Sequence, residues 1–177
     1  IIDPLDGTTN FIHGIPHYAV SIAFRHGGRL QHGVVYDPAQ GEEFTASRGH
    51  GAFLNGKRIR VSGRINAAGA LFATGIPFSG APFAEMDAYL ECLRELAADS
   101  SGIRRMGVAS LDLAYVAAGR CDAYWEMFLQ PWDIAAGTIV VQADPGASDN
   151  YTVSGPGFTD TYTNGGSPPP PPPINTT

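Results

Sequence analysis

The sequence predicts a fold of the α+β or α/β class, in which sheets and helices pack in layers. Three observations support this prediction. Short β-type runs joined by tight turns fill the first third of the chain, an arrangement typical of an antiparallel meander. A longer run at 82–98 repeats its apolar residues every three or four positions, as an amphipathic helix does. Helix-like and strand-like segments then alternate as far as residue 143. We therefore expect a mixed, largely antiparallel first sheet that packs against helices.

The first half of the chain contains the runs that predict the antiparallel strands. The chain opens on the tail of a strand at Ile1-Ile2, and further strands are predicted at 18–24, 30–36 and 42–46. A glycine pair at 27–28 separates the first two of these. Connections this short favour antiparallel pairing.

The segment Gly51–Arg58 matches the phosphate-loop pattern G-x-x-x-x-G-K-[ST] at every position but the last. Arg58 cannot supply the hydroxyl that binds Mg²⁺ in nucleotide hydrolases, and the residues after it alternate like a strand where a phosphate loop requires a helix. Asn55-Gly56 is instead a strong signal for a two-residue hairpin. The hairpin is the preferred interpretation, which disfavours a nucleotide hydrolase.

The second half alternates between strand and helix. Strands are predicted at 70–74 and 121–127, and helices at 82–98, 110–118 and 133–143. Pro82 suits the first position of its helix, and Gly119 suits the position just after the end of the second. The apolar stripe of the first helix predicts five core positions: Phe83, Met86, Leu90, Leu93 and Ala97.

Composition limits the classes of function. The chain has 177 residues, enough for one domain with a real core, and a formal charge of −6. Every Lys and Arg lies at or before Arg120, and an equal number of Asp and Glu residues balances them there. The net negative charge therefore comes from the last third of the chain. The balanced first two-thirds show no basic patch of the kind that binds nucleic acid. Cys92 and Cys121 are too few for a disulfide framework or a zinc site. No apolar run is long enough to span a membrane, so we expect a cytoplasmic protein with no membrane partner.

The stretch Asp3-Pro4-Leu5-Asp6-Gly7-Thr8 is the first candidate site. Two carboxylates stand three residues apart, and Gly7 permits a tight turn that brings backbone N–H groups close to an anion. Mg²⁺ is usually held by one or two carboxylates together with phosphate oxygens. The alternative is an ordinary surface β-turn, since Pro, Asp and Gly dominate turns.

A second candidate lies at Trp132–Gly137, where Asp133 precedes an apolar helical run. Its structural role would be that of an N-cap. Seven residues earlier, Glu126 lies in the strand predicted at 121–127.

These motifs together resemble the inositol monophosphatases, Mg²⁺-dependent and lithium-sensitive phosphomonoesterases. Residues 3–11 fit that family's first signature, approximately D-P-[LIV]-D-G-T-x-N-F, and residues 132–137 fit the second, approximately W-D-x-A-A-G. Segments 104–109 and 122–127 are also similar. The resemblance spans about 1–143, with the motifs in the expected order.

The resemblance implies a layered αβαβα sandwich and a phosphatase that uses two or more Mg²⁺ ions and an activated water, with no covalent intermediate. It implies that the metals are bound by Asp3, Asp6, Asp133 and the carbonyl oxygen of Leu5. The catalytic residues would be these three acids and Thr8, whose hydroxyl would orient the water. Substrate would be bound by Gly7, Thr8, Gly107, Ala109 and Glu126. Inositol phosphate or a related small phosphorylated polyol would be the substrate, and the complete protein would be a homodimer.

Several alternatives stay open. On the same fold the substrate could be histidinol phosphate, fructose 1,6-bisphosphate or a phosphoadenosine nucleotide, although Thr9-Asn10-Phe11 resembles the inositol and histidinol branches more. The family's upstream Glu and Asp would precede Ile1, so we expect 1–143 to be a partial domain that is weak or inactive alone. A non-catalytic remnant is the alternative from another class. Residues 144–177, with six consecutive prolines, are expected to be a low-complexity tail that is non-native or disordered.

Overall fold

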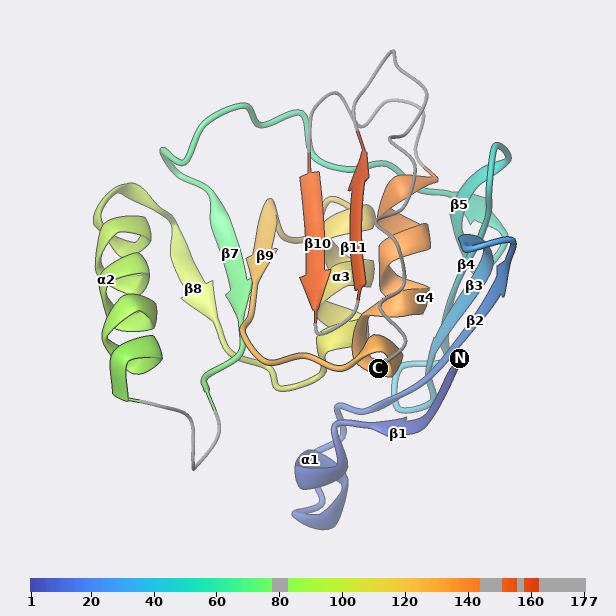
Figure 1. The fold of residues 1–177 in the computed structure, drawn as a ribbon, viewed down its shortest axis with the longest axis horizontal. Helices are drawn as coiled ribbons and strands as arrows, with labels where there is room; N and C mark the ends of the chain where they lie inside the picture. The colour runs from blue at the N-terminus through green and yellow to red at the C-terminus, as the bar shows by residue number, and fades with distance from the viewer. Residues whose placement is uncertain (78–82, 144–150, 156–157, 163–177) are drawn as a thin grey trace.

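The computed structural model describes residues 1–77, 83–143, 151–155 and 158–162. Four layers lie side by side in Figure 1: a six-stranded sheet, the helices α3 (Ala109–Ala117) and α4 (Pro131–Gln142), a three-stranded sheet, and the helix α2 (Phe83–Asp99). The predicted class of layered sheets and helices is confirmed. Among the described helices, none is both long and apolar enough to cross a membrane.

The six-stranded sheet is an antiparallel meander that follows chain order. Its strands are β1 (Ile2–Asp6), β2 (Ala19–His26), β3 (Arg29–Asp37), β4 (Glu42–Ser47), β5 (Gly51–Leu54) and β6 (Lys57–Arg58). Asn55 and Gly56 both have positive φ, 48° and 74°, as a type I′ hairpin turn requires. The predicted hairpin is therefore confirmed in place of a phosphate loop.

The strand β1 lies at the edge of this sheet, next to β2. The pairing register shifts between Asp3 and Asp6. An edge strand with an irregular ladder tolerates Pro4, which has no N–H to donate. The predicted strand tail at Ile1-Ile2 is thus longer than expected and runs through Pro4 to Asp6.

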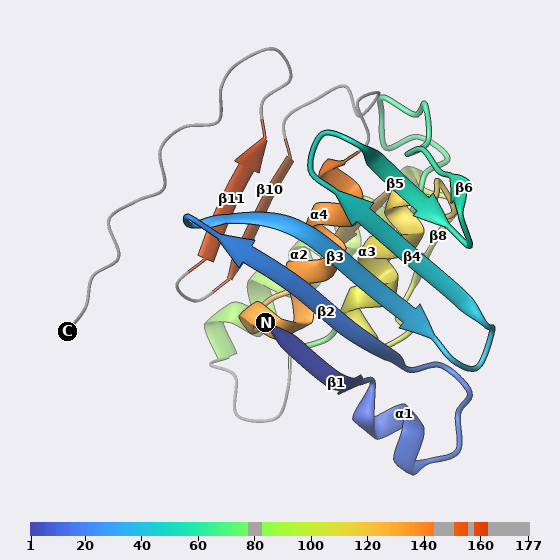
Figure 2. The ribbon, with the colours of Figure 1, turned by 90° about the vertical axis from the view of Figure 1, so that its right-hand side faces the viewer.

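One face of the meander packs against α4, which lies directly over β3. A Cβ atom on Gly33 would clash with the Ile139 side chain and would lie 2.9 Å from the carbonyl oxygen of Ala136. Only glycine at this position lets the helix backbone come so close to the sheet. In Figure 2 the sheet lies in front of α3 and α4, and no described helix covers its nearer face.

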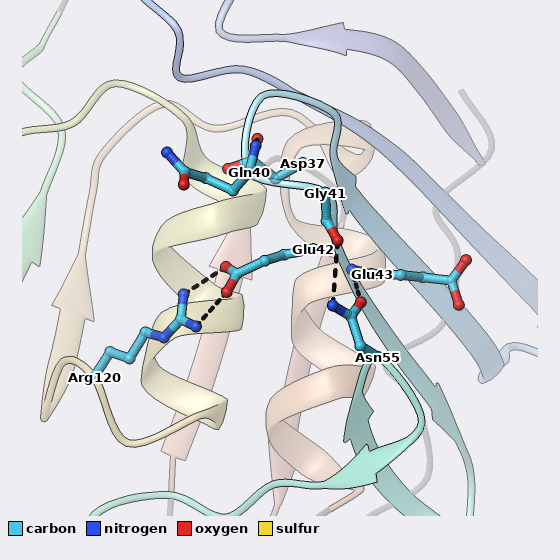
Figure 3. Close-up of polar contacts among 7 residues, drawn as sticks. All are labelled: Asp37, Gln40, Gly41, Glu42, Glu43, Asn55 and Arg120. Atoms are coloured by element: carbon cyan, nitrogen blue, oxygen red, sulfur yellow. Dashed lines mark hydrogen bonds and ion pairs between the residues drawn. The ribbon is translucent and has the colours of Figure 1, made fainter.

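Polar side chains join the far end of this sheet to α3. Arg120, just after α3, donates two hydrogen bonds to the Glu42 carboxylate, at 2.6 and 2.5 Å (Figure 3). Its guanidinium also lies over the Tyr115 ring, 4.9 Å from the centroid. Asn55 closes the neighbouring turn, since it accepts a hydrogen bond from the Glu43 N–H and donates to the Gly41 carbonyl.

The second sheet has three parallel strands in the order β8-β7-β9. They are β7 (Leu71–Thr74), β8 (Gly102–Arg104) and β9 (Ala123–Trp125), so the strand predicted at 121–127 is shorter than expected. The helices α2 and α3 make the two crossovers that parallel pairing needs. The carboxyl ends of all three strands consequently lie at one edge.

The helix α2 is confirmed, but two of its five predicted core positions are wrong, while Met86 and Leu93 are half-buried. Leu90 is 45% exposed and Ala97 is also exposed, whereas Tyr89 is 3% exposed. The Tyr89 ring packs 6.2 Å from that of Trp125, and its hydroxyl accepts a hydrogen bond from Thr74. The buried face of α2 therefore includes Tyr89, whereas Leu90 and Ala97 face solvent. Pro82 and the Phe83 side chain lie outside the described residues.

The remaining short elements are α1 (Thr8–Ile12) and the antiparallel pair β10 (Tyr151–Gly155) and β11 (Phe158–Tyr162). The pair β10–β11 falls within the segment predicted to be low-complexity. The polyproline run lies outside the described residues.

Candidate active site

The turn between β1 and α1 supplies the first group of candidate residues. Gly7 has φ 85°, the left-handed conformation that favours glycine. A Cβ atom there would lie 2.7 Å from Val108 Cγ2 and 3.2 Å from the carbonyl oxygen of His17. The backbone at Gly7 thus lies against Val108, which stands between the two predicted substrate residues Gly107 and Ala109.

Hydrogen bonds fix the side chains of this turn. The Asp3 carboxylate accepts a bond from the Leu5 N–H at 3.0 Å, and the Thr8 hydroxyl donates to the Leu5 carbonyl at 2.8 Å. The Asp6 carboxylate accepts a bond from the Ser110 N–H at 2.8 Å. Since Ser110 lies in the first turn of α3, Asp6 joins the end of β1 to a helix N-terminus, where negative charge is favoured.

Asn10 connects the two halves of the site. Its Nδ2 atom donates to the carbonyl oxygens of His17 and Met106, each at 2.9 Å, and the residue is 8% exposed. Met106 precedes Gly107, whose φ is 79°. Asn10 therefore holds the loop that leads into α3 against the first motif, a role that we did not predict although the residue belongs to that motif.

Asp133 lies in the first turn of α4, but its predicted role as the N-cap is wrong. The helix begins at Pro131 with Gln130 as N-cap, so Asp133 is the third helical residue. Proline is well suited to the first helical position, which moves the start two residues upstream. The Asp133 carboxylate accepts a 2.6 Å bond from the Gln130 N–H.

The carboxylates of Asp3, Asp6 and Asp133 interact electrostatically. Burial raises the pKa of Asp6 to about 6; the hydrogen bonds from Ser110 oppose the shift, and the charges of Asp3 and Asp133 add to it. Burial also raises the pKa of Asp133, and Asp3 adds to that shift. The structure thus brings the three predicted acids within interaction range of each other.

Glu126 follows β9 and lies beside the end of β7. A Cβ atom on Gly75 would overlap the Glu126 carboxylate, so the absence of a side chain at Gly75 makes room for the acid. The Tyr124 hydroxyl donates a 2.6 Å hydrogen bond to Glu126. Burial raises the pKa of Glu126, while that bond and the charge of Arg105 lower it and the charge of Asp133 raises it.

Asp112 is a buried acid that we did not predict to belong to the site. It lies on α3 with no exposed surface, and neither carboxylate oxygen has a hydrogen-bond partner among the described residues. Burial raises its pKa to about 8, with further increases from Glu126 and Asp6 and an opposing effect of Arg105. The sequence signal was an acid between two leucines inside an apolar helical run.

Comparison with known proteins identifies the family. The sequence profile described as "Inositol monophosphatase family" matches residues 1–153. The chain belongs to this family. The match extends past residue 143, where the motifs alone placed the end of the resemblance.

Two similar curated proteins carry different names. The chain is 59% identical over 154 residues to a Pseudomonas aeruginosa protein named Nus factor SuhB, covering 87% of this chain and 57% of that protein. It is 51% identical over 142 residues to a Mesorhizobium japonicum inositol-1-monophosphatase, covering 80% and 53%. The chain thus spans about half the length of the curated relatives it matches.

Solved structures confirm the family fold. The extragenic suppressor protein suhB from Bartonella henselae superposes with a TM-score of 0.79 at 50% identity, over 86% of this chain and 56% of that one. An inositol monophosphatase from Anabaena superposes with a TM-score of 0.77 at 38% identity, over 93% and 66%.

The chemistry of the donor set fits a hard divalent cation. Asp3, Asp6, Asp133 and the Leu5 carbonyl offer oxygen ligands only, which such ions prefer. Burial is the main cause of the raised pKa of Asp6, and repulsion by Asp3 and Asp133 adds to it; a bound cation would relieve that repulsion. Within the described residues, no three acid, His or Cys side chains are already arranged as a metal-binding group, so the ligand set stays a prediction.

Proposed function

We propose that this chain carries the phosphomonoesterase site of an inositol monophosphatase, which hydrolyses inositol phosphate or a related small phosphorylated polyol without a covalent intermediate. The observation that carries the proposal is the mutual interaction of Asp3, Asp6 and Asp133, from β1 and α4, beside the N-terminus of α3. Histidinol phosphate and fructose 1,6-bisphosphate are the alternative substrates.

Asp3, Asp6, Asp133 and the Leu5 carbonyl would hold two or more Mg²⁺ ions. Such ions, when bound, supply charge stabilisation and an activated water for in-line displacement. The burial of Asp6 suits this role, because a poorly solvated carboxylate gains more from a cation than an exposed one.

The protein's own groups would position the phosphate and its leaving group. The Thr8 hydroxyl donates a hydrogen bond to the Leu5 carbonyl, a predicted metal ligand, and would orient the water there. The N–H groups of Gly7 and Thr8 would donate to phosphate oxygens. Glu126 would accept hydrogen bonds from polyol hydroxyls, while Gly107 and Ala109 line the same side.

Metal binding tests this proposal directly. Calorimetric titration of the chain with Mg²⁺ should show binding that is weakened at least about tenfold by Asp6→Asn and by Asp133→Asn, since each loses a charged oxygen ligand. The matched control is Asp87→Asn, an exposed acid on α2. Phosphate release from inositol 1-phosphate should follow the same order. If Mg²⁺ binding is equal in all four proteins, the site assignment is wrong and a non-catalytic remnant becomes the better hypothesis.

Lithium sensitivity, a cytoplasmic location and a homodimeric complete protein belong to this proposal as well. Inhibition of phosphate release by Li⁺ and sedimentation of the complete protein would check the first and last.

A second candidate function rests on the Pseudomonas aeruginosa relative, which carries the name Nus factor at 59% identity. Expression of this chain in a strain that lacks that relative tests it. Restored growth with an Asp6→Asn variant would separate a Nus-factor role from hydrolysis.

A further inference from the structure

The three parallel strands bring three loop residues to one edge. Gly75 follows β7, Arg105 follows β8 and Glu126 follows β9. The central strand β7 has β8 on one side and β9 on the other, so successive crossovers lead to opposite sides of it. Open parallel sheets bind ligands outside the carboxyl ends of their strands at such a point. In Figure 1 this lower edge also meets the N-terminal ends of α3 and α4.

Two glycines leave room at this edge for two charged side chains of opposite sign. Gly75 accommodates the Glu126 carboxylate. Gly107 accommodates the Arg105 guanidinium, since a Cβ atom there would lie 2.8 Å from Arg105 Nη1 and 3.6 Å from Cζ. The cation therefore lies across the backbone of a residue that the family resemblance places in the substrate pocket.

The charge of Arg105 is not neutralised by a close partner. In the part of the chain that the structure describes, its guanidinium makes no ion pair with a carboxylate. It is nevertheless near enough to Glu126 and Asp112 to lower the pKa of both, and Asp6 also acts on Asp112. Arg105 is exposed, and it is not among the groups that shift the pKa of Asp6 or Asp133, so it lies nearer to Asp112 and Glu126 than to those two acids.

We propose that Arg105 is a specificity-determining residue that binds a second phosphoryl group of the substrate, so that the preferred substrate class is a small polyol with two phosphates. The inference rests on the proposed function. The phosphate that is hydrolysed would bind at the cluster of Asp3, Asp6 and Asp133. Glu126 would bind the hydroxyls between the two phosphates, and Arg105 would bind the distal phosphate. A guanidinium offers paired N–H donors that match the oxygens of a phosphate. A substrate hydroxyl does not need such a pair of donors.

Binding of two matched ligands tests the inference. Calorimetry without added metal, so that no turnover occurs, compares inositol 1,4-bisphosphate with inositol 1-phosphate. We expect the bisphosphate to bind about 10- to 100-fold more tightly, the range for one charge-assisted contact. Arg105→Gln should remove this preference and leave inositol 1-phosphate within about twofold of wild type. Arg105→Lys should retain part of this preference, because lysine keeps the positive charge but lacks the paired donors of the guanidinium.

Arg104→Gln is the matched control, since this exposed neighbour donates to its own strand at the Ile103 carbonyl. It should leave both affinities unchanged. Equal affinity of the wild type for the two ligands overturns the inference, as does an equal loss of both in Arg105→Gln; in either case the phosphatase proposal stands. Failure of the wild type to bind either ligand, with or without Mg²⁺, overturns the phosphatase proposal and the inference with it.

Discussion

Replacing Asp112 by asparagine should stabilise the protein by an amount that grows with pH. Burial raises the pKa of this carboxyl from 3.8 to about 8. Between these values the folded protein keeps a proton that the unfolded chain releases, so ionisation favours the unfolded state as pH rises. The stability is fully present below about pH 4 and is lost progressively until the pH passes the folded pKa.

The magnitude follows from the size of the shift. Each pH unit between about 4 and 8 costs roughly 1.4 kcal/mol of unfolding free energy, and the total approaches roughly 6 kcal/mol above pH 8. Asparagine does not ionise, and its amide would be as poorly paired in this position as the neutral carboxyl. We therefore expect Asp112→Asn to match wild type near pH 4 and to exceed it by about 4 kcal/mol at pH 7.

Urea unfolding of both proteins from pH 4 to pH 9, with a chelator present to remove metal ions, measures this difference. Other titrating groups cancel in the comparison, except Asp6 and Glu126, which act on Asp112. A difference in unfolding free energy that stays constant over this range would refute the reasoning. It would show that Asp112 is ionised in the folded state and is paired with a group that the described contacts do not include.

Three further substitutions test how the layers are held. Gly33→Ala should destabilise the protein by about 2 kcal/mol or more in urea unfolding, because its methyl group would clash with Ile139 under α4, whereas the same change at the open Gly63 should not. Asn10→Ala should cost about 1–3 kcal/mol through two lost buried hydrogen bonds, and protection from amide exchange should fall around 106–109; unchanged protection would contradict its bridging role. Arg120→Met should cost only about 1 kcal/mol at low salt and less at high salt, as its pairing with Glu42 is partly exposed; a loss independent of salt would contradict an ionic contribution.

The antiparallel sheet could be predicted because its determinants are local. Alternating residues and the Asn55-Gly56 turn specify hairpins without reference to distant residues. The predicted start of α4 is two residues too late because an acid before an apolar run and a proline two residues earlier both signal a helix start. The buried face of α2 was misplaced because a stripe of apolar residues does not include Tyr89, which packs on Trp125 from another layer.

Only the part of the candidate site that lies within sequence motifs could be predicted. Asp3, Asp6, Asp133 and Glu126 stand in recognisable patterns, and in the structure Asp133 lies within electrostatic range of the other three. Asp112 and Arg105 stood outside the predicted set because their importance depends on tertiary burial and on the empty space above Gly107. Neither property is visible in a linear pattern.

The two sheets contribute different parts of the site. Asp3 and Asp6 come from the edge strand of the meander, whereas Gly75, Arg105 and Glu126 follow the parallel strands. Under the proposed function, mutations in the three loops would change which leaving group is bound while Asp3 and Asp6 stay in place. Substrate preference could then change through a few loop positions, without a change in the residues proposed for hydrolysis.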